Sequence, residues 1–327
     1  MPQPVLMPQP VSPVEISIVV PVYREAKNIL PFIDRTRSAL GSLDNLGVSY
    51  EIIFAVDPSH DGTERLIENE ARLDPRVKML LFSRRFGQPA ATMSGILACS
   101  GNWCAVIDVD LQDPPELIWD LYRKALTDGG YDVVYAQRSS RRGETVVKKT
   151  IAWLGYKLIH GLSDLDIPPN TGDFRIISRR VIEELRLLNE THGFLRGLVS
   201  FVGFRQTSIM YDRDVRLNGK GKYNRYLGSI RIGLNGLISF SSRPLFVMSI
   251  MGVFFAGLSF LLGAWYAFQK FVLGIPLTPG LTTTVLIVSF FSGIQLLSLG
   301  LVGEYVGRIY DEVKRRPLSI VDKKVNM

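Results

Sequence analysis

The sequence predicts an α/β fold, in which a mostly parallel sheet carries helices on both faces, followed by a transmembrane hairpin of two helices. Between residues 14 and 137, apolar β-branched runs alternate with stretches of helical periodicity, the order typical of parallel sheets. Toward the C-terminus, residues 244–268 and 281–303 contain no charged side chain. Each stretch is long enough to cross a hydrocarbon core of about 30 Å.

The strands of the sheet are expected in five apolar runs, and helices after Glu25, Asp61, Gln88 and Pro114. The five runs are residues 16–23, 50–57, 77–83, 103–110 and 131–138. Ligands of such sheets bind beyond the carboxyl ends of the strands. Three of these ends carry polar segments, at residues 21–25, 57–61 and 108–113.

Composition and charge divide the chain into regions. We expect a disordered tail over residues 1–13, an α/β domain over 14–222, an interfacial helix over 223–243, the transmembrane hairpin over 244–303 and a basic cytoplasmic tail over 304–327. The stretch 146–162 is amphipathic, and either a membrane surface or the α/β domain could cover its apolar face. Two buried core helices are the alternative to the hairpin, but such helices seldom stay charge-free for so long.

The distribution of basic residues predicts the orientation in the membrane. Arg243 precedes the first apolar stretch and six basic residues follow the second, whereas only Lys270 lies between the two. Because loops rich in Lys and Arg stay in the cytoplasm, we expect an integral membrane protein with both termini and the α/β domain cytoplasmic. The net charge of +7 favours anionic lipid and phosphorylated ligands over nucleic acid, since the basic residues form no single long patch.

Cysteine and histidine offer no metal site in this sequence. Cys99 and Cys104 lie in apolar surroundings, which is typical of reduced, buried cysteines in a cytosolic domain. The three histidines, His60, His160 and His192, show no ligand-like spacing.

The stretch AVIDVDLQDPPE, residues 105–116, carries the strongest chemical signal. Asp108 and Asp110 are two residues apart at the end of an apolar strand, so their carboxylates can converge on one small volume. Two carboxylates held so close repel unless a cation shares them, and Mg²⁺ or Mn²⁺ bridging to a diphosphate would do so. The alternative is a polar loop in which Asp113 caps a helix that begins near Pro114.

Two other strand ends carry candidate binding residues. In PVYREAKNI, Glu25 lies near the start of a helix, and the backbone around Pro21 and Tyr23 could grip a base and a ribose. In AVDPSHDGT, Asp57 lies at a strand tip, and Asp61 is expected to cap the following helix.

Six ordered motifs, from about Ile16 to the C-terminus, resemble one protein family. They are VVPVYREAKNI, VDPSHDGT, SRRFGQPAATMSGILACSGNWCAVIDVDLQDPPE, NTGDFRIISRR, GFLRGLVSFVGFRQTSIMYDRDVR and GKGKY. The chain is similar to the family-2 inverting glycosyltransferases that load sugar onto polyprenyl phosphate. Dolichyl-phosphate mannose synthases and the bactoprenol glucosyltransferases belong to this group.

The resemblance implies a GT-A (Rossmann-like) catalytic domain with assigned site residues. Nucleotide-sugar binding would fall to Pro21, Tyr23, Glu25, Asp57 and Asp108. Asp110 would hold a divalent cation, Mg²⁺ or Mn²⁺, together with Asp108 and Gln112. Asp173 would be the usual candidate base, and Asp110 the other catalytic residue. The acceptor and its phosphate would be bound by Arg175, Arg196, Arg213, Arg216, Lys220 and Lys222.

This chain departs from the family pattern in three places. Val56, Asp57 and Pro58 stand where two aspartates and a glycine are usual, Arg85 replaces a common Asn, and Gly221 replaces a common Ser. These departures bear on donor selectivity and not on the reaction.

The resemblance implies transfer of one hexose, glucose from UDP-glucose, onto undecaprenyl phosphate at the cytoplasmic face of a bacterial inner membrane. The same chemistry with GDP-mannose or a UDP-aminosugar is the alternative. A catalytically silent nucleotide-sugar-binding scaffold is disfavoured, because Asp108, Asp110 and Asp173 are intact. The expected partners are the nucleotide-sugar donor, the polyprenyl phosphate lipid, the membrane, a second copy of the chain, a flippase and a downstream glycosyltransferase.

Overall fold

The computed structural model describes residues 14–44, 47–127, 129–139, 171–188, 195–213, 238, 241–274 and 280–327. The chain forms two compact units. The first contains Met1–Ile151, Leu165–Gly228 and Arg316–Met327, and the second contains Ala152–Asp164 and Ser229–Arg315. Several predictions fall outside the described residues: the tail 1–13, the amphipathic stretch 146–162, most of the helix 223–243, and Arg216, Lys220 and Lys222.

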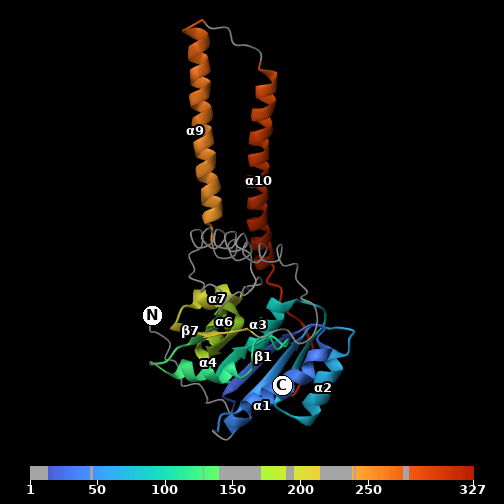
Figure 1. Cartoon of the computed structure of the whole chain (residues 1–327). Coiled ribbons are helices and arrows are strands. Elements are labelled where there is room, and N and C mark those ends of the chain that lie inside the picture. The colour runs from blue at the N-terminus through green and yellow to red at the C-terminus, as the bar shows by residue number, and fades with distance from the viewer. Residues whose placement is uncertain are drawn as a thin grey trace, which may run out of the picture. The chain divides into compact units, whose positions relative to one another are not determined.

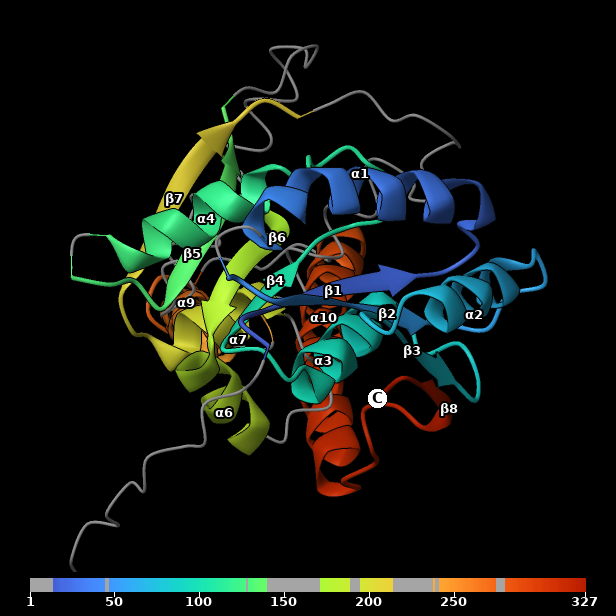
Figure 2. The ribbon, with the colours of Figure 1, turned by 90° about the horizontal axis from the view of Figure 1, so that it is seen from below.

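The first unit is built on a mixed sheet of eight strands in the order β7-β5-β6-β4-β1-β2-β3-β8 (Figures 1 and 2). The strands are β1 (Ile16–Val22), β2 (Tyr50–Val56), β3 (Val77–Phe82), β4 (Trp103–Val106), β5 (Val133–Arg138), β6 (Thr171–Ser178), β7 (Gln206–Tyr211) and β8 (Val321–Val325). Only β6 and β8 run antiparallel to their neighbours. The predicted mostly parallel fold is therefore confirmed.

Helices cover both faces of this sheet (Figure 2). One face packs on α1 (Ala26–Asp44), α2 (Thr63–Leu73) and α4 (Leu117–Leu126), and the other on α3 (Gln88–Ala98), α6 (Arg179–Leu187) and α7 (Leu195–Val202). Alternate residues of β1 serve the two faces: Ile18 and Val20 join the core beneath α1, whereas Val19 meets α3. Gly95 permits this close approach, because a Cβ there would lie 2.4 Å from Val19 Cγ1.

The strand expected over residues 103–110 is shorter than predicted. β4 ends at Val106, and Asp108 and Asp110 lie in the turn that follows. The turn is tight, since Leu111 has a positive φ of 58°. The two aspartates therefore do not share a face of a continuing strand.

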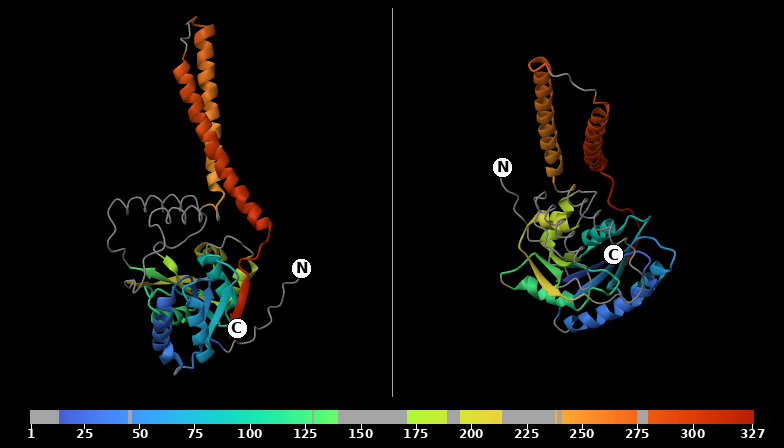
Figure 3. Two further views of the ribbon diagram at one scale, coloured as in Figure 1. Left: turned by 90° about the vertical axis from the view of Figure 1, so that its right-hand side faces the viewer. Right: turned by 45° about the horizontal axis from the view of Figure 1, so that its top comes forward.

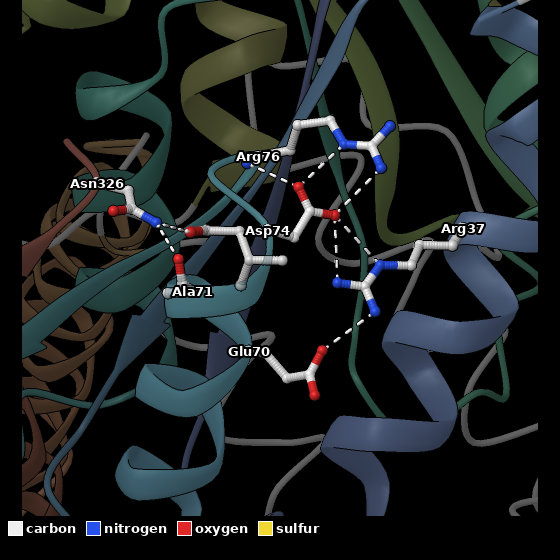
Figure 4. Close-up of polar contacts among 7 residues, drawn as sticks. Arg37, Glu70, Ala71, Asp74, Arg76 and Asn326 are labelled. Carbon is white, nitrogen blue, oxygen red and sulfur yellow. Dashed lines mark hydrogen bonds and ion pairs between the residues drawn. The ribbon is translucent and has the colours of Figure 1, made fainter.

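The C-terminal region contains more structure than the predicted basic tail. β8 pairs antiparallel with β3, at the edge of the sheet (Figure 3). Beyond its end, the Asn326 side-chain amide donates to the carbonyl oxygens of Ala71 at 2.6 Å and Val77 at 3.0 Å (Figure 4). Lys323 Nζ also lies 2.7 Å from Glu68 Oε1. These contacts tie the end of the chain to α2 and β3.

The second unit contains two long helices, α9 (Arg243–Phe271) and α10 (Leu281–Val313). They run antiparallel and side by side, because Phe255 contacts Phe291 at a ring separation of 5.6 Å and the Tyr305 hydroxyl donates to the Ser241 carbonyl at 2.7 Å. Arg243–Trp265 and Phe290–Val313 are candidate membrane spans by length and composition, and 0% of either span is buried within the protein. The second candidate lies further toward the C-terminus than the predicted 281–303.

Candidate active site

The predicted site residues gather at one edge of the sheet. β1, β2, β4, β5 and β7 are mutually parallel and end at this edge, whereas the antiparallel β6 begins there. The side chains that follow or open these strands are Tyr23, Asp57, Asp108, Asp110, Arg213 and, at the start of β6, Asp173. Sheet topology thus unites residues that are up to 190 positions apart, Tyr23 and Arg213.

An excess of negative charge surrounds Asp108. Burial, followed by the charges of Asp173, Asp113 and Asp110, raises the pKa of Asp108 to about 7, against a smaller opposing effect of Arg213. Asp108 Oδ1 accepts a hydrogen bond of 3.1 Å from the side-chain amide of Gln88, at the start of α3. A raised carboxyl pKa at the end of a strand marks Asp108 as a candidate functional residue.

The cation site predicted from the sequence involves Asp108, Asp110 and Gln112. Asp110 is 7% exposed, and its Oδ1 accepts a hydrogen bond of 3.2 Å from the backbone N–H of Gln112. Within the part of the chain that the structure describes, no group of three or more His, Cys, Asp or Glu side chains could hold a metal. The predicted ligand set contains two carboxylates, Asp108 and Asp110, with the amide oxygen of Gln112, and oxygen donors are those that Mg²⁺ and Mn²⁺ prefer.

Asp173 is paired with two arginines. Its Oδ1 accepts a hydrogen bond of 2.9 Å from Arg196 Nε and lies 4.0 Å from Arg175 Nη2. Burial raises the pKa of Asp173, but the charges of Arg196 and Arg175 and the hydrogen bond from Arg196 outweigh it, so that the pKa lies below its usual value. Asp173 is therefore a firmly ionised carboxylate.

Arg175 is placed differently from its predicted role. It is 0% exposed, donates to the carbonyl oxygens of Asp173 and Gly172, and lies over the Tyr135 ring with its guanidinium carbon 4.9 Å from the centroid. These contacts fit a residue that orients the start of β6 beneath Asp173 better than one that touches an acceptor phosphate.

On the nucleotide side, Asp57 and Glu25 hold the protein backbone and neighbouring side chains. The two Asp57 oxygens accept hydrogen bonds from the backbone N–H groups of Phe86 at 2.8 Å and Gly87 at 2.9 Å. Gly87 has a φ of 93°, a conformation that favours glycine. Glu25 Oε2 accepts from the Asn28 side-chain amide at 2.6 Å. Both carboxylates thus shape this end of the sheet, and their contact with a nucleoside stays a prediction.

Tyr23, at the end of β1, lies between two arginines. The guanidinium carbon of Arg85 is 4.1 Å from the ring centroid, and that of Arg24 is 5.2 Å away. Arg85 replaces the Asn that is common in the family. This departure from the family pattern therefore lies beside Tyr23, a predicted nucleotide-binding residue.

The two predicted helix caps have different outcomes. Asp61 Oδ1 accepts a hydrogen bond of 3.2 Å from the backbone N–H of Thr63, the first residue of α2, but the N-cap position itself is Gly62. Asp113 does not cap a helix: α4 begins at Leu117, and the Asp113 carboxylate instead binds Tyr211 and Arg213. The cap prediction for Asp113 was wrong because the helix starts three residues later than Pro114 suggested.

Sequence reasoning also missed Arg138 at the end of β5. Arg138 is in register with Tyr211 of β7, and the charges of Asp113 and Asp108 act on it. A Cβ at Gly172 would lie 3.1 Å from Arg138 Nη2, so the glycine leaves room for the guanidinium. Arg138 is the last residue of the predicted strand 131–138, and this position could have identified it as a site residue.

A mixed α/β sheet with carboxylates and guanidinium groups at its carboxyl edge agrees with the predicted GT-A fold class. Residues 17–186, more than half of the chain, match the family described as Glycosyl transferase family 2. The chain belongs to this family, and it is a glycosyltransferase.

Several known proteins are similar to the chain along nearly its whole length. The uncharacterized glycosyltransferase YkcC of Bacillus subtilis is 43% identical over 95% of this chain and 94% of its own length. The SfII prophage-derived bactoprenol glucosyl transferase of Shigella flexneri is 40% identical over 94% of this chain and 98% of its own. Among solved structures, the mannosyltransferase PcManGT from Pyrobaculum calidifontis, in complex with GDP-Man and Mn2+, has a TM-score of 0.45 at 15% identity, over 94% of this chain and 91% of that one.

Proposed function

We propose that the protein transfers one hexose, glucose from UDP-glucose, onto the phosphate of a polyprenyl lipid, undecaprenyl phosphate. Similarity to a bactoprenol glucosyl transferase over 94% of this chain supports this acceptor and this sugar. The two candidate spans support a membrane-anchored enzyme, which a lipid acceptor requires. We place both termini on the cytoplasmic side, with a flippase, a downstream glycosyltransferase and a second copy of the chain as partners.

The observation that carries the proposal is the meeting of opposite charges at one sheet edge. Asp108 and Asp110 would hold a divalent cation, with Gln112 as the third ligand. When bound, that cation supplies Lewis-acid stabilisation of the charge on the departing nucleoside diphosphate. Arg196 is paired with Asp173, and Arg213 is paired with Asp113. Both arginines would bind phosphate oxygens in the bidentate manner of arginine.

The role we propose for Asp173 is to position the acceptor or the sugar through Arg196. A carboxylate whose pKa is lowered by two arginines is a poor base. The acceptor needs none, because a phosphate monoester with a second pKa of about 6 is mostly ionised at neutral pH. Asp173→Asn should therefore lose activity by the same factor at pH 6 and at pH 8. Recovery of activity at the higher pH would assign proton removal to Asp173 instead.

The reaction is tested with purified full-length protein in detergent, undecaprenyl phosphate and a panel of UDP- and GDP-sugars, with and without chelator. We expect glucosyl transfer from UDP-glucose that chelator abolishes. Asp110→Asn should reduce the rate by at least about 100-fold, since a catalytic metal contributes several kcal/mol and each 1.4 kcal/mol is a factor of ten.

Asp120→Asn is the matched control, because Asp120 is an exposed carboxylate of α4 that is paired with Arg123. It should behave as the parent protein. If sugar is transferred only from GDP-mannose or a UDP-aminosugar, the proposed donor is wrong, and the proposed transfer to the lipid phosphate stands. Full activity of Asp110→Asn in chelator would reject the proposed cation site.

A further inference from the structure

We propose that Asp113 is a positioning residue that ties Arg213, the start of the basic segment 213–222, to the loop that carries Asp110 and Gln112. The inference deepens the proposed function and rests on it, because it concerns the spacing between the two groups that would meet the phosphates. Asp113 follows Gln112 directly in the chain, and Arg213 is two residues beyond the end of β7.

The tie consists of one carboxylate oxygen with two donors. Asp113 Oδ1 accepts a hydrogen bond of 2.5 Å from the Tyr211 hydroxyl and one of 3.1 Å from Arg213 Nε. Tyr211 is the last residue of β7 and Arg213 lies two positions beyond it, both about 100 residues from Asp113 along the chain. The contacts therefore connect the end of β7 to the loop.

Burial makes these contacts strong. The Asp113 side chain is 3% exposed, and a buried carboxylate is costly unless donors and an opposite charge compensate it. Tyr211 stays a donor at every physiological pH, because burial, the charge of Asp113 and their hydrogen bond raise the pKa of Tyr211 to about 12. The Tyr211 ring also packs edge-on against Phe174, with 6.1 Å between centroids. The ring thus has a packing role that is separate from its hydroxyl.

The tie has a direct consequence for the acidic cluster. Asp108 lies close enough for the Arg213 charge to lower its pKa. Without Asp113, the Arg213 guanidinium could pair with the carboxylates that we assign to the cation, and it would then leave its phosphate-binding position. The ion pair with Asp113 keeps Arg213 away from those carboxylates. Arg216, Lys220 and Lys222 follow Arg213 in the sequence, so the tie also sets where this basic segment begins.

Steady-state kinetics of Asp113→Asn test the inference in the full-length enzyme. A hydrogen bond between charged groups contributes about 1.5–3 kcal/mol, so we expect the KM for undecaprenyl phosphate to rise about tenfold or more. The KM for the nucleotide sugar should stay near that of the parent. A role in stability alone would change the KM values of both substrates alike.

The double-mutant cycle with Arg213→Gln identifies the partner. Once Arg213 is gone, Asp113→Asn should change the KM for the lipid by less than about twofold, because coupled residues are not additive. Equal effects of Asp113→Asn in both backgrounds would overturn the proposal. If Asp113→Asn does not fold, Tyr211→Phe takes its place in the cycle with Arg213→Gln, because phenylalanine keeps the ring packing. Equal effects of Tyr211→Phe in both backgrounds would then overturn the proposal.

Trypsin cleavage separates failure of this inference from failure of the proposed function. In Asp113→Asn the bond after Arg213 should be cut several-fold faster than in the parent, because the guanidinium is released, while Asp120→Asn should match the parent. If the parent transfers no sugar to the lipid, the proposed function is wrong, and this cleavage rate still decides the tie. An unchanged rate would show that Asp113 does not hold Arg213.

Discussion

The two ends of the same sheet differ in how their carboxylates are compensated. Near the strand starts, Glu51 of β2 is 1% exposed and has a partner for each oxygen. At the strand ends, Asp108 shares its surroundings with three other carboxylates, and its pKa rises to about 7. Glu51 is balanced by the charge of Lys78, and we call the strand end unbalanced because repulsion of Asp108 by other carboxylates exceeds the opposing effect of Arg213.

The network around Glu51 spans three adjacent strands and a turn. Lys78 Nζ of β3 lies 2.5 Å from Glu51 Oε2, while Oε1 accepts from the Ser17 hydroxyl of β1 at 2.5 Å and from Ser100 N at 2.8 Å. Burial raises the pKa of Glu51, but the hydrogen bonds from Lys78, Ser17 and Ser100 outweigh it and hold the pKa below its usual value. Every strong interaction of this carboxylate is made within the protein.

We interpret the difference as one between a structural carboxylate, Glu51, and a candidate binding residue, Asp108. A buried charge that the protein compensates contributes to stability and offers nothing to a ligand. A charge that the protein leaves uncompensated lowers stability, and it favours the binding of a cation. We therefore expect substitutions at the two ends to change stability in opposite directions.

The largest effect is expected from Glu51→Gln, at the balanced end. The amide leaves Lys78 without its counter-charge, and breaking a buried pair in this way costs about 3 kcal/mol or more. For a domain of this size that is a fall in unfolding temperature of about 6–12 °C, measured on the full-length protein in detergent.

The double variant Glu51→Gln with Lys78→Met is the control. It removes the unpaired charge as well, so it should recover part of the lost stability. If Glu51→Gln alone melts at the parent's temperature, the network is not what holds the strand starts together, and the contrast with the strand ends fails.

The strand-end site could be predicted from sequence because local signals coincide there. Asp57 and Asp108 each follow an apolar run, and parallel topology brings such ends together without any knowledge of distances. The role of Asp113 could not be predicted in the same way. Its partners lie about 100 residues away, and the sequence Asp-Pro-Pro resembles the start of a helix, so local chemistry favoured a cap.

β8 and the Glu51 network were missed for related reasons. β8, with the sequence VDKKV, is short and charged, which is typical of a polar tail, and its pairing with β3 depends on an edge more than 230 residues away. Glu51 reads as a single charge inside an apolar strand. Only the register of β1, β2 and β3 shows that Ser17 and Lys78 lie on the same face beside it.

A smaller effect of the opposite sign is expected from Asp108→Asn, at the unbalanced end. The pKa of Asp108 is raised from about 4 to about 7 by folding, so the parent loses stability as pH rises through this interval and shows the full loss above pH 7. The amide has no charge to lose. The variant should therefore unfold about 2–4 °C higher than the parent at pH 8, which is about 1 kcal/mol, and the gain should be smaller at pH 5.

Divalent cation sharpens the same measurement. At pH 8, Mg²⁺ or Mn²⁺ should raise the unfolding temperature of the parent, because a ligand that binds the folded state stabilises it, and should raise that of Asp108→Asn much less. Asp120→Asn should respond as the parent does. A lower unfolding temperature for Asp108→Asn at pH 8 would mean that the hydrogen bond from Gln88 to Asp108 outweighs the repulsion, and that both ends of the sheet use their carboxylates to hold the fold.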